Sequence, residues 1–181
     1  MALQQDKLFI TKEAFDTYRD VSEHMDNERM NASILEAQVS DLVGFIGAPL
    51  YSLLQADFTA PGTWATAKYE TLFNGEIYTP AGSKYTEIYH GIQPMLTLFS
   101  YARMLNNLQL AVTRSGPVTF TEADVSDPTV QAQIKTKVID ARAMAVRYQE
   151  EVQKYLETNK SDYPEYVNQH EQNKTFKFIK I

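Results

Sequence analysis

The feature that most constrains this chain is an uninterrupted helical pattern that begins at Asp127-Pro128 and continues to about Asn159. Aspartate caps the unpaired amides of a first turn, and proline fits the first helical position. Apolar residues then recur at alternating steps of four and three, and they form one seam: Ile134, Val138, Ala141, Ala145, Tyr148, Val152 and Tyr155. Because such a seam must be buried against another element, the chain is expected to be a helical bundle organised along one strut.

Composition narrows the class of protein further. The chain has 181 residues, 44% hydrophobic and 22% charged, which is typical of one folded domain. Its net charge of −6 argues against a protein that grips nucleic acid, because that affinity rests on Lys and Arg. The absence of cysteine excludes disulfides and thiolate chemistry. We expect a protein made in the cytoplasm, because no signal-peptide pattern and no membrane-length apolar run is present.

Several shorter helical patterns precede the strut. Apolar spacing predicts helices over about 28–45, from Pro49 to Leu54, and after Thr63 as far as Asn74. A strongly apolar helix is predicted over about 88–108, although Pro94 favours a start at Gln93. Since apolar residues cover most of its circumference, this helix is expected to be the buried centre of the bundle and to receive the seam of the strut.

The remaining segments have no helical period. Residues 76–86 predict a small β-hairpin with Tyr78 facing Tyr85 across a turn at Pro80 and Gly82. Residues 109–127 predict an extended arm or loose hairpin. We therefore expect a mainly α protein: an N-terminal arm (1–10), a helical domain (11–166, with the arm inserted at about 109–127) and a C-terminal docking tail (167–181).

Catalytic and metal-binding signatures are absent from the sequence. There is no phosphate loop, dinucleotide fingerprint or nucleophile elbow. His24, His90 and His170 are far apart and have no metal-ligand spacing, and the adjacent Glu150 and Glu151 point in different directions on a helix. The sequence therefore predicts a protein that is not an enzyme and has no catalytic, metal or cofactor site.

Candidate interaction residues lie on the two appendages. The arm carries Val118, Phe120 and Val125, and the tail carries Phe176, Phe178 and Ile181. The tail alternates apolar and polar residues like a strand without a partner, which is typical of a peptide that docks onto another subunit. The alternative interpretation is a frayed end. Tyr163 and Tyr166 are instead expected to pack at the end of the strut.

Three stretches taken together carry a resemblance to a known family. The first is Ile34-Leu-Glu-Ala-Gln-Val-Ser-Asp-Leu, followed by Gly47, Leu50-Tyr51 and Leu53-Leu54. The second runs from Gly91 through Met95-Leu-Thr-Leu-Phe-Ser-Tyr-Ala-Arg103. The third is Tyr155-Leu-Glu-Thr-Asn159, followed by Asp162-Tyr-Pro-Glu-Tyr166. Their order and spacing resemble the helical head-to-tail connector proteins of tailed bacteriophages, closest to those of Bacteroidetes and crAss-like phages.

The resemblance implies a structural protein of the virion. Connectors of this class are non-enzymatic adaptors that assemble as rings, commonly of twelve copies, below the portal. The ring continues the channel for double-stranded DNA from capsid to tail. For this chain, the implied partners are further copies of itself, the portal protein or other neck and tail proteins. The alternative is a small helical ligand-binding or regulatory protein, whose pocket would be lined by Trp64, Tyr69, His90 and Tyr101.

Overall fold

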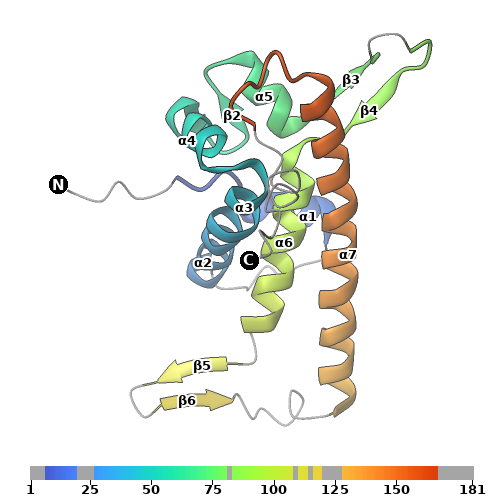
Figure 1. The fold of residues 1–181 in the computed structure, drawn as a ribbon. Helices are drawn as coiled ribbons and strands as arrows, with labels where there is room; N and C mark the ends of the chain where they lie inside the picture. Colours follow the sequence, from blue (N-terminus) through green and yellow to red (C-terminus); the bar gives the residue numbers. More distant parts are fainter. Residues whose placement is uncertain are drawn as a thin grey trace, which may run out of the picture.

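The computed structural model describes residues 7–19, 27–80, 83–107, 110–113, 116–119 and 128–166. Its helices are α1 (Lys12–Tyr18), α2 (Asn27–Ala37), α3 (Val43–Ile46), α4 (Ala48–Asp57), α5 (Ala67–Asn74), α6 (Ile92–Asn107) and α7 (Pro128–Thr158). Antiparallel strand pairs are formed by β1 (Phe58–Ala60) with β2 (Thr63–Trp64), β3 (Glu76–Tyr78) with β4 (Glu87–Tyr89), and β5 (Leu110–Thr113) with β6 (Gly116–Thr119). The predicted mainly α bundle with one long C-terminal helix is confirmed (Figure 1).

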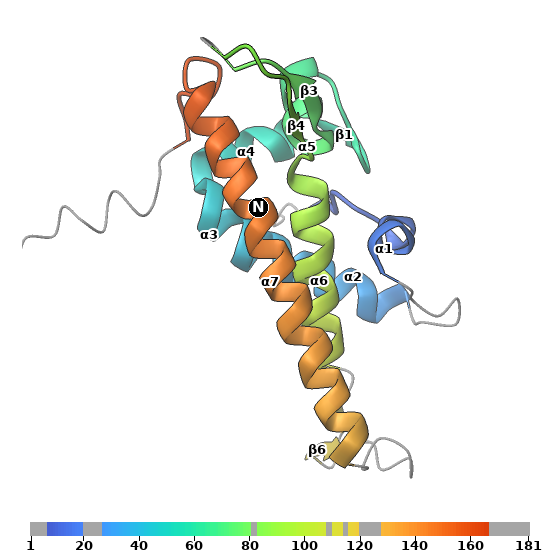
Figure 2. The same cartoon turned by 90° about the vertical axis from the view of Figure 1, so that its right-hand side faces the viewer.

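Helix α7 is the strut, and α6 packs along it while α7 extends beyond both ends of α6 (Figures 1 and 2). Its 31 residues span about 47 Å at the usual rise of an α-helix. The predicted seam faces α6: Val138, Ala141, Ala145, Val152 and Tyr155 are buried, and Ile134 and Tyr148 pack half-buried against the core. The periodicity of the sequence therefore identified both the strut and its buried face.

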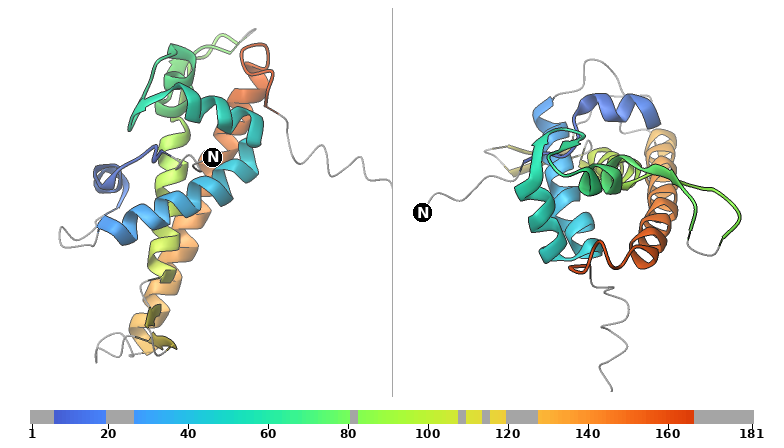
Figure 3. Two further views of the ribbon diagram at one scale, coloured as in Figure 1. Left: turned by 90° about the vertical axis from the view of Figure 1, so that its left-hand side faces the viewer. Right: turned by 90° about the horizontal axis from the view of Figure 1, so that it is seen from above.

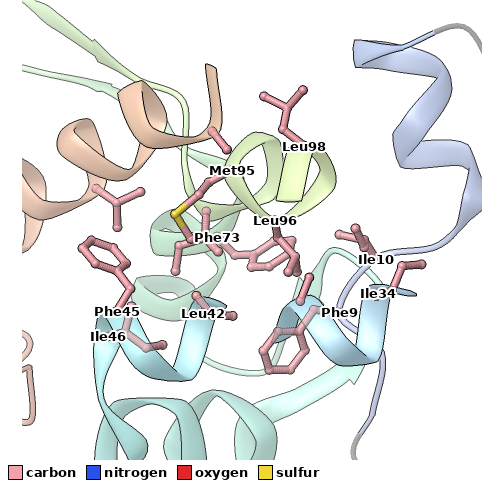
Figure 4. Close-up of a cluster of buried hydrophobic side chains, with 14 of the residues drawn as sticks. Phe9, Ile10, Ile34, Leu42, Phe45, Ile46, Phe73, Met95, Leu96 and Leu98 are labelled. Carbon is pink, nitrogen blue, oxygen red and sulfur yellow. The ribbon is translucent and has the colours of Figure 1, made fainter. Parts of the chain in front are cut away.

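Helix α6 is the centre of the bundle, as its apolar composition predicted. The α2–α3 segment covers one side and α7 covers the other, which is seen most clearly from above (Figure 3). Figure 4 shows Met95 and Leu96 of α6 pointing toward side chains of the α2–α3 segment such as Leu42. Most positions of α6 are consequently buried, including polar Thr97 and Ser100, whose hydroxyls donate to carbonyls four residues earlier.

A charged contact fixes α6 to the α2–α3 side. Arg103 donates from Nε to Asp41 Oδ2 at 2.7 Å and from Nη2 to Asp41 Oδ1 at 3.0 Å. Its Nη1 lies 2.8 Å from Glu36 Oε1. The hydrogen bonds to Asp41 and the nearby carboxylates raise the pKa of Arg103. The planar fork of arginine suits this two-carboxylate arrangement, so the contact orients α6 as well as holding it.

The helix from Asn27 to Ile46 contains one π turn, η1 (Gln38–Leu42). This turn places the side chain of Gln38 inside the core with no exposed surface. Gln38 Oε1 accepts from the Phe9 amide at 2.7 Å, and its Nε2 donates to the Lys7 carbonyl at 2.9 Å. The π turn thus presents a polar clamp to a segment 29 residues earlier in the chain.

The clamp corrects the expected N-terminal arm. Phe9 and Ile10 are buried, and the Phe9 ring contacts Tyr51, Phe58, Trp64 and Phe73. Phe9 and Ile10 are therefore part of the core, with half-buried Leu8 packed against it, and residues 1–6 lie outside the described residues. The sequence did not reveal this because three apolar residues in a row have no period.

Two glycines allow the α5–β3 junction and the β4–α6 junction to cross. Gly75 has φ +89° and Gly91 has φ +82°. A Cβ added to Gly91 would lie 2.2 Å from the Phe73 carbonyl oxygen, and one added to Gly75 would lie 2.2 Å from the Tyr89 carbonyl oxygen. Gly91 lies between β4 and α6, and α6 begins at Ile92, one residue before the Gln93 start that Pro94 favoured and four residues after Ile88.

Other local predictions also need correction. The chain after α4 forms the strand pair β1–β2 where a loop was expected, because strands of two or three residues leave no alternation to read. In the predicted hairpin, Tyr78 pairs with Glu87 and not with Tyr85. Residues 110–119 contain the hairpin β5–β6, in which Val112 pairs with Pro117. A separate finding concerns membranes: none of the described helices is long and apolar enough to cross one.

Candidate functional site

The most prominent exposed apolar surface lies on the β3–β4 hairpin. Ile77 and Ile88 are direct cross-strand partners, and their side chains are 70% and 64% exposed. Tyr85, just before β4, is 79% exposed. We call these three residues the hairpin surface. Figures 1 and 3 show that the hairpin projects beyond α7, away from the bundle. Large apolar side chains grouped on a projecting element are typical of an interaction site.

The opposite face of the same hairpin is anchored by aromatic packing. The Tyr89 ring is stacked on the Tyr155 ring, with centroids 4.0 Å apart and planes 3° from parallel. Tyr78 meets the same ring edge-on at 5.4 Å. The Tyr89 hydroxyl donates to the Leu72 carbonyl at 2.7 Å, which connects the hairpin to α5. The hairpin is therefore a rigid extension of the end of α7.

Polar contacts strengthen this anchor. The Tyr155 hydroxyl donates to Glu76 Oε1 at 2.6 Å, and Lys154 Nζ lies 2.6 Å from Glu87 Oε2. Burial and the bond to Glu76 raise the pKa of Tyr155, and burial raises the pKa of Tyr89 well above its usual value. Burial likewise raises the pKa of nearby Tyr163 to about 12. These phenols stay neutral at physiological pH, so they act as hydrogen-bonding packing groups and not as acids.

His90, at the junction of β4 and α6, is a third contact between this end of the bundle and α7. Its Nδ1 lies 2.8 Å from Glu151 Oε2, and its ring meets Tyr148 edge-on at 5.4 Å. Both partners lie on α7. His90 thus joins the start of the central helix to the strut, while Glu150 next to Glu151 is exposed.

A second surface lies around the middle of α7. Ile139 is 60% exposed and Val146 is 45% exposed. They lie two turns apart on one face of the helix, beside the seam that α6 covers. Next to them is an open groove of about 610 Å³, whose lining includes Asn106 of α6 and Ile134, Lys135 and Arg142 of α7. The hairpin surface thus lies at the C-terminal end of the strut and this second surface around its middle.

The described residues contain no group of three side chains that could hold a metal ion. His90 belongs to the contact with Glu151, and His24 and His170 lie outside the described residues. The groove beside α7 is open, and its polar lining consists of one lysine, one arginine and two amides, while the other four lining residues are apolar.

The structure reaches few of the predicted interaction residues. Val118 lies in β6 opposite Ala111. Phe120, Val125, Phe176, Phe178 and Ile181 lie outside the described residues and stay predictions. Tyr163 and Tyr166 are buried as expected, and Tyr166 meets the Phe45 ring at 6.4 Å.

The proposed pocket residues are not gathered in one cavity. Trp64 packs on Phe9, Phe58 and Phe73, and its indole N–H donates to the Leu54 carbonyl at 3.0 Å. Tyr69 and Tyr101 are also buried in the core. These side chains support the fold. The groove beside α7 includes none of them in its lining.

Sequence reasoning missed the hairpin surface, although a signal was present. Both strands have the sequence Glu-Ile-Tyr, at residues 76–78 and 87–89. Each strand therefore carries an apolar residue on one face and an aromatic residue on the other, so the hairpin has two apolar faces and the bundle covers only one.

The described residues define a mainly helical protein built on a strut, with one exposed apolar surface at the C-terminal end of the strut and another around its middle. The chain belongs to a family of unknown function, DUF6712, whose match covers residues 42–176. The matched region contains α6, the hairpin and the whole of α7. No curated protein and no solved structure matches the chain.

Proposed function

We propose that this chain is a structural subunit of a tailed bacteriophage. It forms an oligomeric ring at the head–tail junction, below the portal, which continues the DNA channel and joins the capsid to the tail. In this proposal the chain is not an enzyme, and its partners are further copies of itself and the portal or other neck and tail proteins. The proposal rests on the resemblance of three stretches, to which the contacts of the fold add support.

The three stretches that carry the resemblance pack into one unit. Asp41 of the first stretch holds Arg103 of the second through two hydrogen bonds. Phe45, just after the first stretch, packs on Tyr166 at the end of the third. The resemblance therefore concerns one continuous structural unit and not three separate short motifs.

The hairpin surface is the structural observation that best supports assembly with other subunits. Ile77 and Ile88 lie on an element that the tyrosine contacts hold rigidly and that extends past the bundle. Burying two such side chains against a partner is worth roughly 1.5–3 kcal/mol each, which the isolated chain does not gain. A ring uses contacts between two different patches of each subunit, and a projecting hairpin suits that arrangement.

The charge of the chain is compatible with a channel. With a net charge of −6, the protein repels DNA overall, so a lining of this composition lets the polymer pass without holding it. The β5–β6 hairpin lies at the other end of the strut (Figure 1), and its neighbours Phe120 and Val125 are proposed to contact an adjacent subunit. Phe176, Phe178 and Ile181 are proposed to dock on the portal or on a neighbouring layer.

The experiment is electron microscopy of the purified chain with and without the portal protein of the same genome, together with the mass in solution. We expect a ring with a channel wide enough for duplex DNA, or an added layer on the portal. The paired change Ile77→Ser and Ile88→Ser is expected to abolish that layer. Val39→Ser is the matched control, because Val39 is 48% exposed but lies on η1. A chain that stays a compact monomer and leaves the portal unchanged refutes the proposal.

The groove beside α7 supports a second candidate, a ligand-binding or regulatory protein. Its volume of about 610 Å³ is in the range of small-molecule sites, and Lys135 and Arg142 would favour an anionic ligand. A thermal-shift screen of anionic metabolites tests this candidate, since a ligand that binds only the folded chain raises its melting temperature. If Arg142→Ala leaves every such shift unchanged, the groove does not bind the ligand.

A further inference from the structure

The exposed stripe of α7 has a spacing that is the same from both ends. Starting at Lys135, the residues of one face follow at steps of four, three, four, four, three and four. The positions are Lys135, Ile139, Arg142, Val146, Glu150, Gln153 and Glu157. Six of the seven are exposed, and Gln153 is half-buried. We call these seven residues the α7 stripe; they lie beside the seam that α6 buries.

Val146 is the centre of this pattern, and the charges invert about it. Arg142 and Lys135 stand four and eleven residues before Val146, while Glu150 and Glu157 stand four and eleven residues after it. Ile139 and Gln153 stand seven residues on either side. One half of the stripe is therefore basic and apolar, and the other half is acidic and polar.

We propose that the α7 stripe binds the α7 stripe of a second copy in antiparallel orientation, with the two-fold axis at Val146. In that arrangement Arg142 faces Glu150 of the second copy, and Lys135 faces Glu157. Because the contact is two-fold, each ion pair forms twice. Ile139 and Val146, the large apolar side chains exposed on this helix, are covered at the same time.

The charge pattern selects the antiparallel orientation over the parallel one. In a parallel pair, each position meets the same position of the partner, so Arg142 would face Arg142 and Glu150 would face Glu150. Like charges placed opposite each other destabilise a helix pair, and opposite charges stabilise it. Only the antiparallel pair satisfies both ends of the stripe.

Three charged groups of the stripe are available for this contact: among the described residues, Lys135, Arg142 and Glu150 form no ion pair. Glu157 already accepts a hydrogen bond from Gln153 Nε2 at 2.9 Å, inside the stripe. Other charged residues of α7 already have partners on other faces: Asp140 pairs with Arg19 of the α1 end, and Lys154 pairs with Glu87 of the hairpin. Because Lys154 is not part of the stripe, its ion pair with the hairpin can stay intact when a second copy binds the stripe.

This contact goes beyond the proposed ring and does not depend on it. A two-fold contact is complete with two copies and does not extend, whereas a ring requires like-oriented neighbours. The inference therefore concerns the free chain, which would exist as a dimer that covers Ile139 and Val146.

The test is the mass of the full chain in solution, measured by sedimentation between about 5 and 500 µM, where a two-helix contact of this small size is expected to associate. The wild-type chain is expected to be a dimer at the upper end. Arg142→Glu replaces two attractions with two repulsions and should weaken the dimer roughly 30-fold, taking about two- to threefold for each exposed pair. Glu150→Arg should do the same. Arg147→Glu is the matched control, because Arg147 is exposed on another face of α7 and should leave the dimer unchanged.

A mixing experiment separates this geometry from any other. Neither Arg142→Glu nor Glu150→Arg dimerises alone, but an equimolar mixture of the two should form a dimer, since every facing pair is then complementary. The double variant Arg142→Glu, Glu150→Arg should also dimerise. A wild-type monomer at every concentration, a free ring, or a mixture that stays monomeric overturns the proposal. The ring itself is tested separately with the hairpin variants and the portal.

Discussion

Replacing Gln38 with alanine should detach the N-terminal segment and destabilise the fold. The Gln38 side chain has no exposed surface, and its Oε1 accepts a hydrogen bond from the buried Phe9 amide at 2.7 Å. Gln38→Ala leaves that amide without its acceptor, which costs about 1–3 kcal/mol. The Lys7 carbonyl loses less, because Gln55 Nε2 also donates to it at 3.1 Å. The truncated side chain leaves a cavity that adds about 1 kcal/mol.

The expected total is about 3 kcal/mol of unfolding free energy. For a chain of this size, each kcal/mol shifts the melting temperature by about 2–4 °C, so a fall of about 6–12 °C is expected. Urea denaturation measures the free energy, and calorimetry measures the melting temperature. Trypsin digestion gives a second readout, because Lys7 and Lys12 flank the buried segment and should be cut faster in the variant.

Gln133→Ala is the matched control for this prediction. Gln133 lies on α7 and is exposed, so its replacement should change the unfolding free energy by less than about 0.5 kcal/mol. If Gln38→Ala is as stable as this control and is digested no faster, then Gln38 does not hold residues 7–10 in the core. The segment would then be the arm that the sequence suggested.

Two further predictions concern the hairpin and its attachment. Gly91→Ala should lower the free energy of unfolding by at least about 3 kcal/mol, because φ is +82° and the new Cβ would lie 2.2 Å from a backbone oxygen. The measurement is the yield of soluble folded chain on expression, which should be lost in this variant. A variant as stable as the wild-type chain contradicts the prediction. The pKa of Tyr163 is raised to about 12 and that of Tyr155 is also raised, so both phenols stabilise the fold fully below pH 10, and this stabilisation is lost as the pH rises through 10–12. Thermal melts from pH 8 to about 11.5 should therefore show a smaller alkaline loss of stability for Tyr155→Phe than for the wild-type chain. Equal losses would mean that ionisation of Tyr155 does not contribute to alkaline unfolding.

The sequence predicted the long helices because each carries many repeats of its period. The seam from Ile134 to Tyr155 spans six steps, so a single misplaced residue does not hide it. Helix α6 was recognised from its apolar composition, and Pro94 indicated its start to within one residue. Gly91, between β4 and α6, has its positive φ because of a crossing with α5, and that crossing is a tertiary feature.

The elements that escaped prediction depend on distant partners. Burial of Phe9 requires Gln38, 29 residues away, and nothing local to either residue indicates the contact. The hairpin surface was harder still to predict from the sequence, since Ile77 and Ile88 look like ordinary strand residues. Their exposure follows from the covering of the other hairpin face by Tyr155, which is 67 residues beyond Ile88.

The π turn at Gln38–Leu42 also sets the phase of the helix that contains it. One additional residue in a turn rotates everything after it by about 100° relative to a regular α-helix. Ile34 before the turn, Leu42 at its end, and Phe45 and Ile46 after it are all buried in the core, so the rotation is built into the packing of both halves. The turn therefore fixes the rotational phase of the second half of the helix. A one-residue deletion there would leave the helix continuous but rotate the buried face of its second half away from α6.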